Sequence, residues 1–493
     1  MKSIKLILLL VGILCTISCS EDFLENPPLT TVTDATFPST ERDALLVTNA
    51  AYSNLRNWWY MGGYPLAGIL SDDQTKGSED GSNPDLAQIE NFTFTPAHPF
   101  ILAWYQTLFQ SVRHANIVTE RVPDIEMDVP LKERYIAEAR FLRAHSYFTL
   151  VRLFGDVPKV LDTNPERTLP RVSKEAIYQE VILPDLLAAI DILPEKSEYA
   201  GEDLGRATKG AAKSLLARVY LFRGDFENCL KYTSEVINSG QYSLDPSYPN
   251  VFSIHGEFGT GSIFELGAIS GGRAEGGNQY GNTQGVRGEP NWGWGFGRPS
   301  WNYLNHFETG DPRRDASVIF LGEVLSGIKI LGNTLTTDTL YDAQNKIVEI
   351  ECYNQKVYVE EIDGTRANWG HNRRLIRYAD ILLMAAECQN ELGHPMEALA
   401  LLNQIRARAR GENNDILLDI TTTDKAELRP LIWKERRSEL AFETLRYFDL
   451  IRQNRMAEVL APLGFTANKN ELLPIPQQEI DLSEGMMQQN PNW

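Results

Sequence analysis

Apolar residues recur at intervals of three and four through much of the chain. One such series, at spacings of three, four and three, consists of Phe141, Ala144, Phe148 and Val151. This spacing predicts a helix over residues 131–154 with a single apolar stripe. The Gly-Asp-Val-Pro sequence that follows is typical of a helix end.

Two further pairs of apolar stripes predict helical hairpins. The first hairpin spans residues 207–242 and turns at Gly224, and the second begins at Ile376 and turns at Gly393. Small residues at the helix crossing and glycine at the turn are typical of tetratricopeptide-like units. The two turn glycines are 169 residues apart, so we expect separate hairpins embedded in a larger, mostly helical fold.

Residues 256–301 break the helical pattern. Eleven glycines fall between Gly267 and Gly297, with several aromatic residues among them. We expect a long loop here, because no helix tolerates this glycine content. Long loops in compact domains are often functional.

Short runs with alternating polarity follow this glycine-rich stretch. Residues 316–362 contain two of them, Ile347 to Ile350 and Lys356 to Val359, which predict a few minor strands. The chain from Leu472 onwards is rich in proline and glutamine, and we expect it to be extended.

The N-terminus has the pattern of a secretory signal. Lys2 and Lys5 precede a nine-residue apolar run, which is far shorter than the roughly 20 residues of a membrane-spanning helix. Ser18 and Cys19 then resemble a bacterial lipobox, so we expect a signal peptide over residues 1–18 and lipid on Cys19. Ordinary signal cleavage and a cytosolic protein with an apolar start are the alternatives.

Lipid on Cys19 would anchor an otherwise soluble body to a membrane. Residues 19–40 contain a Pro-Pro pair and a threonine-rich stretch, and we expect them to act as a tether. Residues 41–493 then form one domain. It divides into a helical part (41–255), a loop-rich part (256–365) and C-terminal helices with an extended tail (366–493).

Charge and motif content narrow the classes of function. The 493 residues carry a net charge of −19, which disfavours nucleic-acid binding because phosphate backbones are negative. Beyond Cys19 an odd number of cysteines remains (Cys229, Cys352, Cys388), which gives no disulfide framework. The sequence lacks HExxH, CxxC, GxSxG and EF-hand patterns, so we expect no metal, no cofactor and no catalysis. A calcium site in the acidic run from Asp73 to Asp85 is the alternative, because calcium takes oxygen ligands.

Aromatic side chains in loop-like stretches are the candidate ligand contacts. Sugar rings bind to flat apolar faces with polar groups beside them, and Trp and Tyr provide such faces. The candidates are Trp58, Trp59, Tyr60, Tyr64, Asp72, Asp73, Trp292, Trp294, Phe296, Trp301, Asn368 and Trp369. Core packing is the alternative for each aromatic residue, and a helix cap or surface turn for the aspartate pair. Trp104 and Trp433 lie in helical patterns and are expected in the core.

One stripe of charged residues near the C-terminus needs a separate explanation. It consists, at helical spacing, of Arg436, Glu439, Glu443 and Arg446. Opposite charges at these spacings pair along a helix, and we expect an ion-pair network that includes Arg377 and Asp380. The alternative is a pair of glycosidase carboxyl groups, which would have to face each other across a cleft.

Seven segments, in order, resemble the SusD/RagB family of Bacteroidetes outer-membrane lipoproteins. They are the Cys19 lipobox with its acidic Ser-Glu-Asp sequel, AEARFLRA at 137–144 running to FGDVP at 154–158, the hairpin over 207–242, TGDPRRD at 309–315, RYADILLMAAE at 377–387, ERRSELAFE at 435–443, and LPIP at 473–476 with the terminal QNPNW. One segment alone would be weak, whereas seven in order are specific.

The resemblance implies a mostly helical SusD-like fold and a place on the outer membrane, facing the cell exterior. It also implies a partner, a SusC-like TonB-dependent transporter, to which such proteins pass captured oligosaccharides. Members of the RagB kind capture peptides instead. Two competing hypotheses are a glycoside hydrolase anchored at the cell surface and a purely structural tetratricopeptide scaffold.

Overall fold

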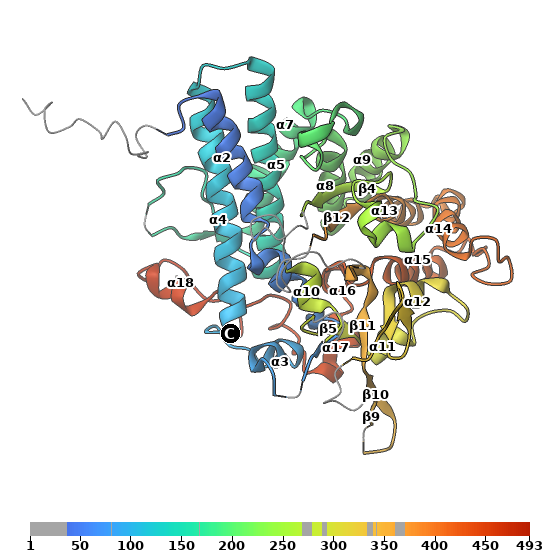
Figure 1. The fold of residues 1–493 in the computed structure, drawn as a ribbon. Coiled ribbons are helices and arrows are strands. Elements are labelled where there is room, and N and C mark those ends of the chain that lie inside the picture. The colour runs from blue at the N-terminus through green and yellow to red at the C-terminus, as the bar shows by residue number, and fades with distance from the viewer. Residues whose placement is uncertain are drawn as a thin grey trace, which may run out of the picture.

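Three helices of the N-terminal part lie side by side in the computed structural model, which describes residues 37–79, 81–166, 168–268, 279–287, 293–332, 339–341, 343–359 and 370–493. They are α2 (Glu41–Asn54), α4 (Pro99–Arg121) and α5 (Val129–Phe154) (Figure 1). α5 begins where the Asp128 side chain accepts a hydrogen bond from the Leu131 N–H. It ends at Gly155, whose φ is +72°. The predicted helix over 131–154 is therefore confirmed.

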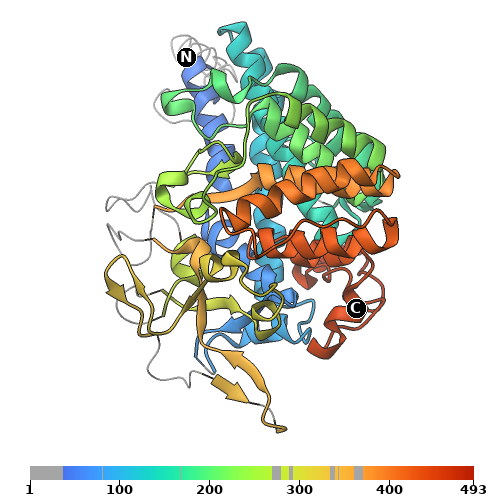
Figure 2. The same ribbon diagram turned by 90° about the vertical axis from the view of Figure 1, so that its right-hand side faces the viewer.

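Both predicted hairpins are present. The first consists of α8 (Lys209–Phe222) and α9 (Phe226–Asn238), and the second of α13 (Tyr378–Glu391) and α14 (Pro395–Arg410). α9 packs against α13 although the two are far apart in sequence. Figure 2 shows the resulting stack, with the orange second hairpin beside the green first one. Ile376 lies in a strand and not in α13, which is a small correction.

Strands in the described residues form six antiparallel pairs. They are β1 (Gln74–Gly77) with β5 (Phe296–Pro299), β2 (Val157–Pro158) with β3 (Arg171–Val172), β4 (Ser262–Leu266) with β12 (Arg373–Arg377), β6 (Val318–Phe320) with β11 (Cys352–Asn354), β7 (Val324–Leu325) with β8 (Ile328–Lys329), and β9 (Thr339–Tyr341) with β10 (Ile347–Ile350). The last pair projects from the lower edge in Figure 1.

The remaining helices are mostly short. They are α3 (Pro84–Glu90), α6 (Lys174–Ile177), α7 (Leu183–Ile192), α10 (Tyr280–Gln284), α11 (Trp301–Leu304), α12 (Pro312–Ser317), α15 (Lys425–Leu440), α16 (Arg446–Arg452), α17 (Met456–Leu460) and α18 (Gln477–Leu482). The described residues also contain two π-helical turns, Trp59–Gly63 and Tyr178–Ile182, and several 3-10 turns. Within the described residues, no helix has the length and apolar character needed to cross a membrane.

Two expectations about irregular stretches were incomplete. Residues 256–301 contain β4, α10, β5 and the start of α11, so they do not form one long loop. All five residues of β4 are buried, and a strand buried on both faces lacks the alternation that would predict it. The C-terminal tail is not fully extended either, because it contains α18.

The strand prediction over 316–362 was half right. β10 coincides with the run from Ile347 to Ile350, but the run beginning at Lys356 is a 3-10 turn, and the strand lies just before it, at β11. The buried Lys356 ammonium donates to the carbonyls of Glu439 and Ala441 (3.0 and 2.8 Å) and pairs with Glu443 (2.9 Å). In the 3-10 turn, the Lys356 ammonium thus reaches buried oxygen partners that compensate for its own burial.

The charged residues of the stripe form ion pairs as expected, but in separate groups and not as one network along a single helix. α15 ends at Leu440, and Phe442 and Thr444 have φ of +67° and +61°. The pairs therefore join different elements. Arg377 of β12 contacts Glu439 (3.2 Å) and Glu443 (2.7 Å).

The arginines around Glu439 also keep its carboxyl group ionised. Burial raises the pKa of this carboxyl, but the charges of Arg408, Arg377 and Arg313 outweigh burial and hold the pKa at about 2. Arg436 similarly pairs with the buried Asp380 at 2.7 Å. These carboxylates are enclosed by arginines, as the structural interpretation of the stripe predicted.

Candidate functional site

The segment after α2 carries two half-buried tryptophans. Trp58 and Trp59 lie at the start of the π-helical turn Trp59–Gly63, which leads into a buried 3-10 helix, Tyr64–Leu70. π-helical turns are rare and are frequent at functional sites. The turn packs on α4 and on α10, so both indoles are held by elements from other parts of the chain.

A second segment brings Trp294 to the same place. β5 pairs with β1, with Phe296 opposite Gly77, and the Trp294 N–H donates to the Asn282 carbonyl at 2.8 Å. Gly295 has a φ of +70°, a conformation that glycine adopts without steric cost. The strand pairing and this turn place Trp294 beside Trp58, although the two are far apart in sequence.

The three indoles form a cluster, here named the aromatic face (Trp58, Trp59, Trp294). The ring centres of Trp58 and Trp294 lie 6.5 Å apart with their planes inclined by 49°. Trp58 and Trp59 meet edge to face at 4.4 Å. All three side chains are partly exposed, so the cluster offers apolar ring surface to a ligand while its base packs on the core.

Two glycines lie directly beneath Trp58. A Cβ added at Gly62 would lie 2.9 Å from Trp58 Nε1 and 2.9 Å from Thr283 Oγ1. A Cβ at Gly63 would lie 3.4 Å from Trp58 Cζ3. The indole therefore rests against bare backbone, and a side chain at Gly62 would displace it.

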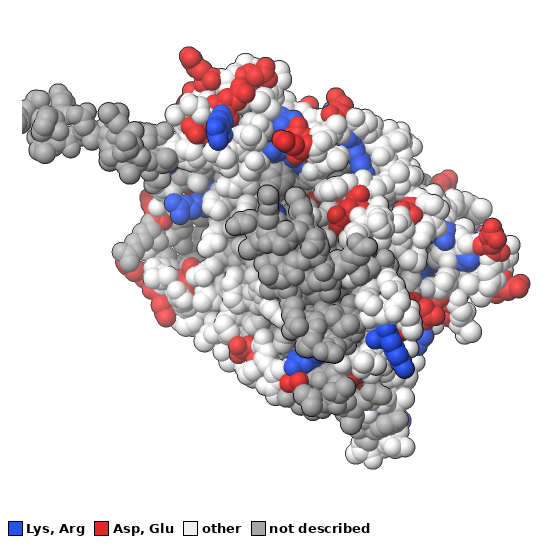
Figure 3. Space-filling view, in the orientation of Figure 1, with Lys and Arg blue, Asp and Glu red and all other residues white. Residues whose placement is uncertain are grey.

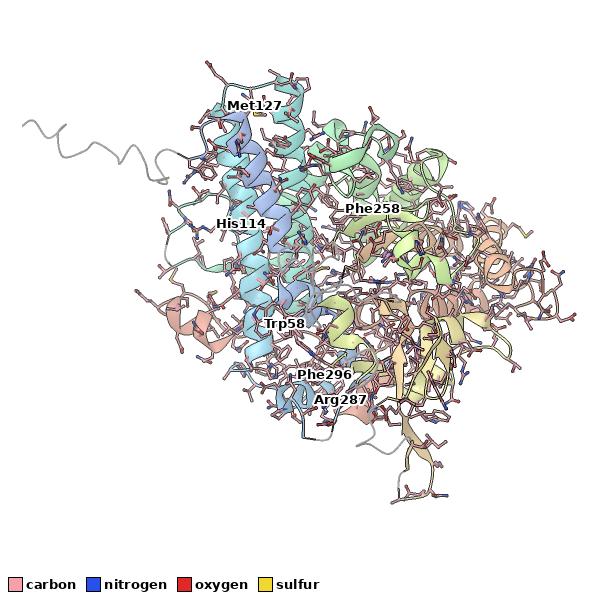
Figure 4. The ribbon with its side chains drawn as sticks, in the orientation of Figure 1. Trp58, His114, Met127, Phe258, Arg287 and Phe296 are labelled. Carbon is pink, nitrogen blue, oxygen red and sulfur yellow. The ribbon has the colours of Figure 1, made fainter. Side chains whose placement is uncertain are left out.

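Charged groups lie near the aromatic face. Arg287 pairs with Glu79 at 2.6 Å, and their side chains are 26% and 34% exposed. Figure 4 places Trp58, Phe296 and Arg287 in the same lower part of the molecule. On the face drawn in Figure 3, basic and acidic side chains of the described residues are interspersed. The Arg287–Glu79 pair thus provides one charge of each sign near the aromatic face.

Tyr60 and Tyr64 lie in the core beneath the indoles. Their exposed fractions are 2% and 5%, and their rings stack 5.4 Å apart. The Tyr60 hydroxyl contacts His145 Nε2 at 2.5 Å, and the Arg373 guanidinium lies over the Tyr60 ring at 5.1 Å. The structure therefore places both tyrosines beneath the aromatic face.

Asp72 and Asp73 are buried in ion pairs. Arg446 contacts Asp72 at 2.8 Å, and Arg437 contacts Asp73 at 2.6 Å. Burial raises the pKa of Asp72, but the Arg446 hydrogen bond and the charge of Arg437 outweigh burial and lower the pKa overall. The pair links the segment before β1 to α15 and α16.

The remaining candidates are distributed differently. Phe296 is half-buried at the start of β5 and packs on the main core. Trp301 begins α11 and packs on a separate cluster that contains Tyr303 and Phe442. Cys19, Trp292, Asn368 and Trp369 lie outside the described residues.

Sequence reasoning missed two contributors. Phe100 of α4 contacts both Trp58 (6.0 Å) and Trp59 (5.4 Å) edge to face. Its place at the start of an amphipathic helix indicated only core packing. Arg287 lies in the glycine-rich stretch, where one arginine among glycines gives no pattern. Trp104, at 1% exposure, lies in the core as expected.

Among the described residues, no group of three or more His, Cys, Asp or Glu side chains is placed to hold a metal ion. Cys229, Cys352 and Cys388 are free and buried. The described part of the site consists of indole rings with charged groups nearby.

Comparisons with known proteins agree with this architecture. Residues 260–493 match the family model described as "SusD family", and residues 75–221 match one described as "Starch-binding associating with outer membrane". SusD-like protein P2 of Formosa agariphila is 28% identical, covering 100% of this chain and 100% of its own. A SusD-like protein of Bacteroides ovatus is 27% identical, covering 92% of this chain and 82% of its own.

Solved structures give the same result for the fold. A laminarin-binding SusD-like protein superimposes with a TM-score of 0.77 at 27% identity, covering 92% of this chain and 100% of its own. A SusD homologue from Bacteroides thetaiotaomicron superimposes with a TM-score of 0.79 at 25% identity, covering 94% and 99%. The mostly helical fold class predicted from the sequence is thereby confirmed.

Proposed function

Because this chain belongs to the SusD/RagB family, we propose that it is a cell-surface lipoprotein that binds glycans without altering them. It captures oligosaccharides for import through a SusC-like TonB-dependent transporter. The names of its relatives support this role, since one solved relative binds laminarin and one matching family model is described as starch-binding.

The proposal depends mainly on one observation, which is that Trp58 and Trp294 lie side by side. Their ring centres lie 6.5 Å apart, and both side chains are partly exposed. Indoles that remain partly exposed beside one another provide the apolar faces on which sugar C–H groups stack.

Lipid on Cys19 would attach the domain to the outer membrane, with residues 19–40 as the tether. An acylated cysteine anchors a protein at the surface without crossing the bilayer. Acidic residues directly after Cys19 resemble the export signal of surface lipoproteins, which supports an outward-facing orientation.

Calorimetric titration of residues 20–493 with laminarin, soluble starch and a peptide mixture tests the binding role. We expect saturable binding to a glycan with no products released. Trp58→Ala and Trp294→Ala should each weaken that binding by about 1–3 kcal/mol, the usual contribution of a stacked aromatic ring.

Trp301→Ala is the matched control, because Trp301 is also half-buried but packs on a separate cluster. It should leave the affinity unchanged. Binding of peptides alone would indicate a RagB-like protein instead. Release of sugar products would indicate a hydrolase. Unchanged affinity in both test variants would show that the glycan binds at another place on the protein.

A further inference from the structure

A separate groove runs between α2, the first turns of α5 and the segment that leads into α8. Its volume is about 1070 Å³, and its walls include Ser53 of α2, Tyr135 of α5, Leu204 of the 200–206 segment and Phe258. The groove reaches Arg56, two residues before Trp58. In Figure 4, Phe258 lies well above Trp58, so the groove extends away from the aromatic face.

The polar groups of the groove are fixed in position by one another. Asp203 accepts from Arg134 (3.1 Å) and from Arg206 (2.7 Å). Arg206 also pairs with the buried Glu138 at 2.9 Å and donates to the exposed Asn49 side chain at 2.8 Å. Planar amide, carboxylate and guanidinium groups held in this way are preorganised to bond hydroxyl groups.

The charges of this cluster cancel. Its two arginines, Arg134 and Arg206, are matched by Glu138 and Asp203. An anionic ligand would have to compete with the paired carboxylates for the guanidinium groups, and a cationic ligand with the arginines for the carboxylates. A neutral ligand can form hydrogen bonds with both kinds of group without separating these ion pairs.

Apolar surface lies beside these polar groups. Leu204 is 47% exposed, and Tyr52 and Phe258 are partly exposed. Gly205 has a φ of +90°, and a Cβ there would lie 2.8 Å from the Phe258 ring, so the loop packs closely on that ring. Apolar faces with a few convergent polar groups are typical of small-molecule sites.

We propose that this groove is a second binding site for a neutral oligosaccharide, adjoining the aromatic face. The inference rests on the proposed glycan-binding function and extends it from one cluster of rings to a longer contact along α2. In this arrangement, one part of a polysaccharide binds to the indoles, and the part that continues beyond them binds in the groove.

Selective chemical blocking of the groove tests the proposal. The described cysteines are buried, so an exposed cysteine introduced into residues 20–493 can be labelled alone. Ser53→Cys and Leu204→Cys place a bulky maleimide on two lining elements of the groove, α2 and the 200–206 segment. Leu418→Cys is the control, since Leu418 is 64% exposed and does not line the groove. Each protein is titrated with laminarin and with soluble starch before and after labelling.

Labelling at Ser53 or Leu204 should weaken polysaccharide binding at least fivefold, and labelling at Leu418 should leave it within twofold. In a Trp58→Ala background, the label at Ser53 should weaken the residual binding by at least a further fivefold. Affinity within twofold for both groove labels would overturn the second site while leaving the aromatic face intact. Failure of the unlabelled chain to bind any glycan would overturn the proposed function itself.

Discussion

Gly62 determines how closely Trp58 packs against the chain. Gly62→Ala would bring a Cβ to 2.9 Å from Trp58 Nε1 and from Thr283 Oγ1, so the indole has to move. We expect glycan binding to weaken about tenfold, corresponding to about 1.4 kcal/mol. Calorimetry of the variant measures this. Gly63→Ala, whose Cβ would approach Trp58 only to 3.4 Å, is the matched control, and equal affinity in the two variants would contradict the role of Gly62.

Glu257 should make stability depend on pH. Burial raises the pKa of this carboxyl from 4.5 to about 7, and the Asn372 N–H and the charge of Arg374 offset burial only in part. Because the folded protein holds this proton more tightly, Glu257 stabilises the fold below about pH 4.5, and this contribution is lost as the pH rises through 7.

Glu257→Gln should remove this dependence. Relative to the variant, the wild type should lose about 1–3 kcal/mol of unfolding free energy between about pH 5 and pH 8. Urea unfolding at both pH values measures the difference. Glu458→Gln, at a carboxylate with 69% side-chain exposure, controls for the change of residue type. Parallel pH profiles for wild type and Glu257→Gln would contradict the prediction.

At the scale of elements, buried ion pairs join β12 to the end of α15. Arg377, Glu439 and Glu443 have side-chain exposures of 3%, 0% and 7%. Arg377→Met should destabilise the protein by about 3–5 kcal/mol, because it removes one of the cations that neutralise these two buried carboxylates. Thermal or urea unfolding checks this. The Arg377→Met/Glu443→Gln double variant should recover part of the loss.

An exposed ion pair gives the contrast. Arg410 contacts Asp419 at 2.6 Å, but the Asp419 side chain is 53% exposed. Arg410→Met should cost less than about 1 kcal/mol, as surface pairs usually do. If the two single variants lost equal stability, burial would not be what makes the Arg377 network important.

At the scale of the whole molecule, we expect attachment to the membrane to depend on Cys19. Cys19→Ala removes the acceptor thiol, and we expect the protein to leave the membrane fraction. Fractionation of cells that express the full chain, followed by immunoblotting, measures the change. Cys388→Ala is the control, because Cys388 is buried in α13. A Cys19→Ala variant that remains wholly with the membrane would contradict lipidation.

The helical hairpins were predictable because their signal is local. The apolar stripes of α8 and α13 and the glycines at their turns lie within a few residues of one another. β4 was missed because its five residues are all buried, which leaves no alternation to detect. The charged stripe was predicted to form ion pairs and does so, but most of its partners, such as Arg408 and Lys356, were not predicted. Its geometry was not predicted either, since Phe442 and Thr444 adopt positive φ and end the helical path.

The sequence by itself determined the long helix at 131–154, the two helical hairpins, the pattern of a secretory signal, the motifs of the family and the stripe of charged residues that form ion pairs. Each of these is encoded in residues close together in the chain or in short motifs. Only the tertiary structure decided which aromatic residues face solvent. Tyr60 is two residues from Trp58, yet it is buried at 2% exposure, whereas Trp294 lies beside Trp58. The exposure of a side chain depends on which distant segments pack over it. The order of polar and apolar residues around that side chain does not indicate these long-range contacts.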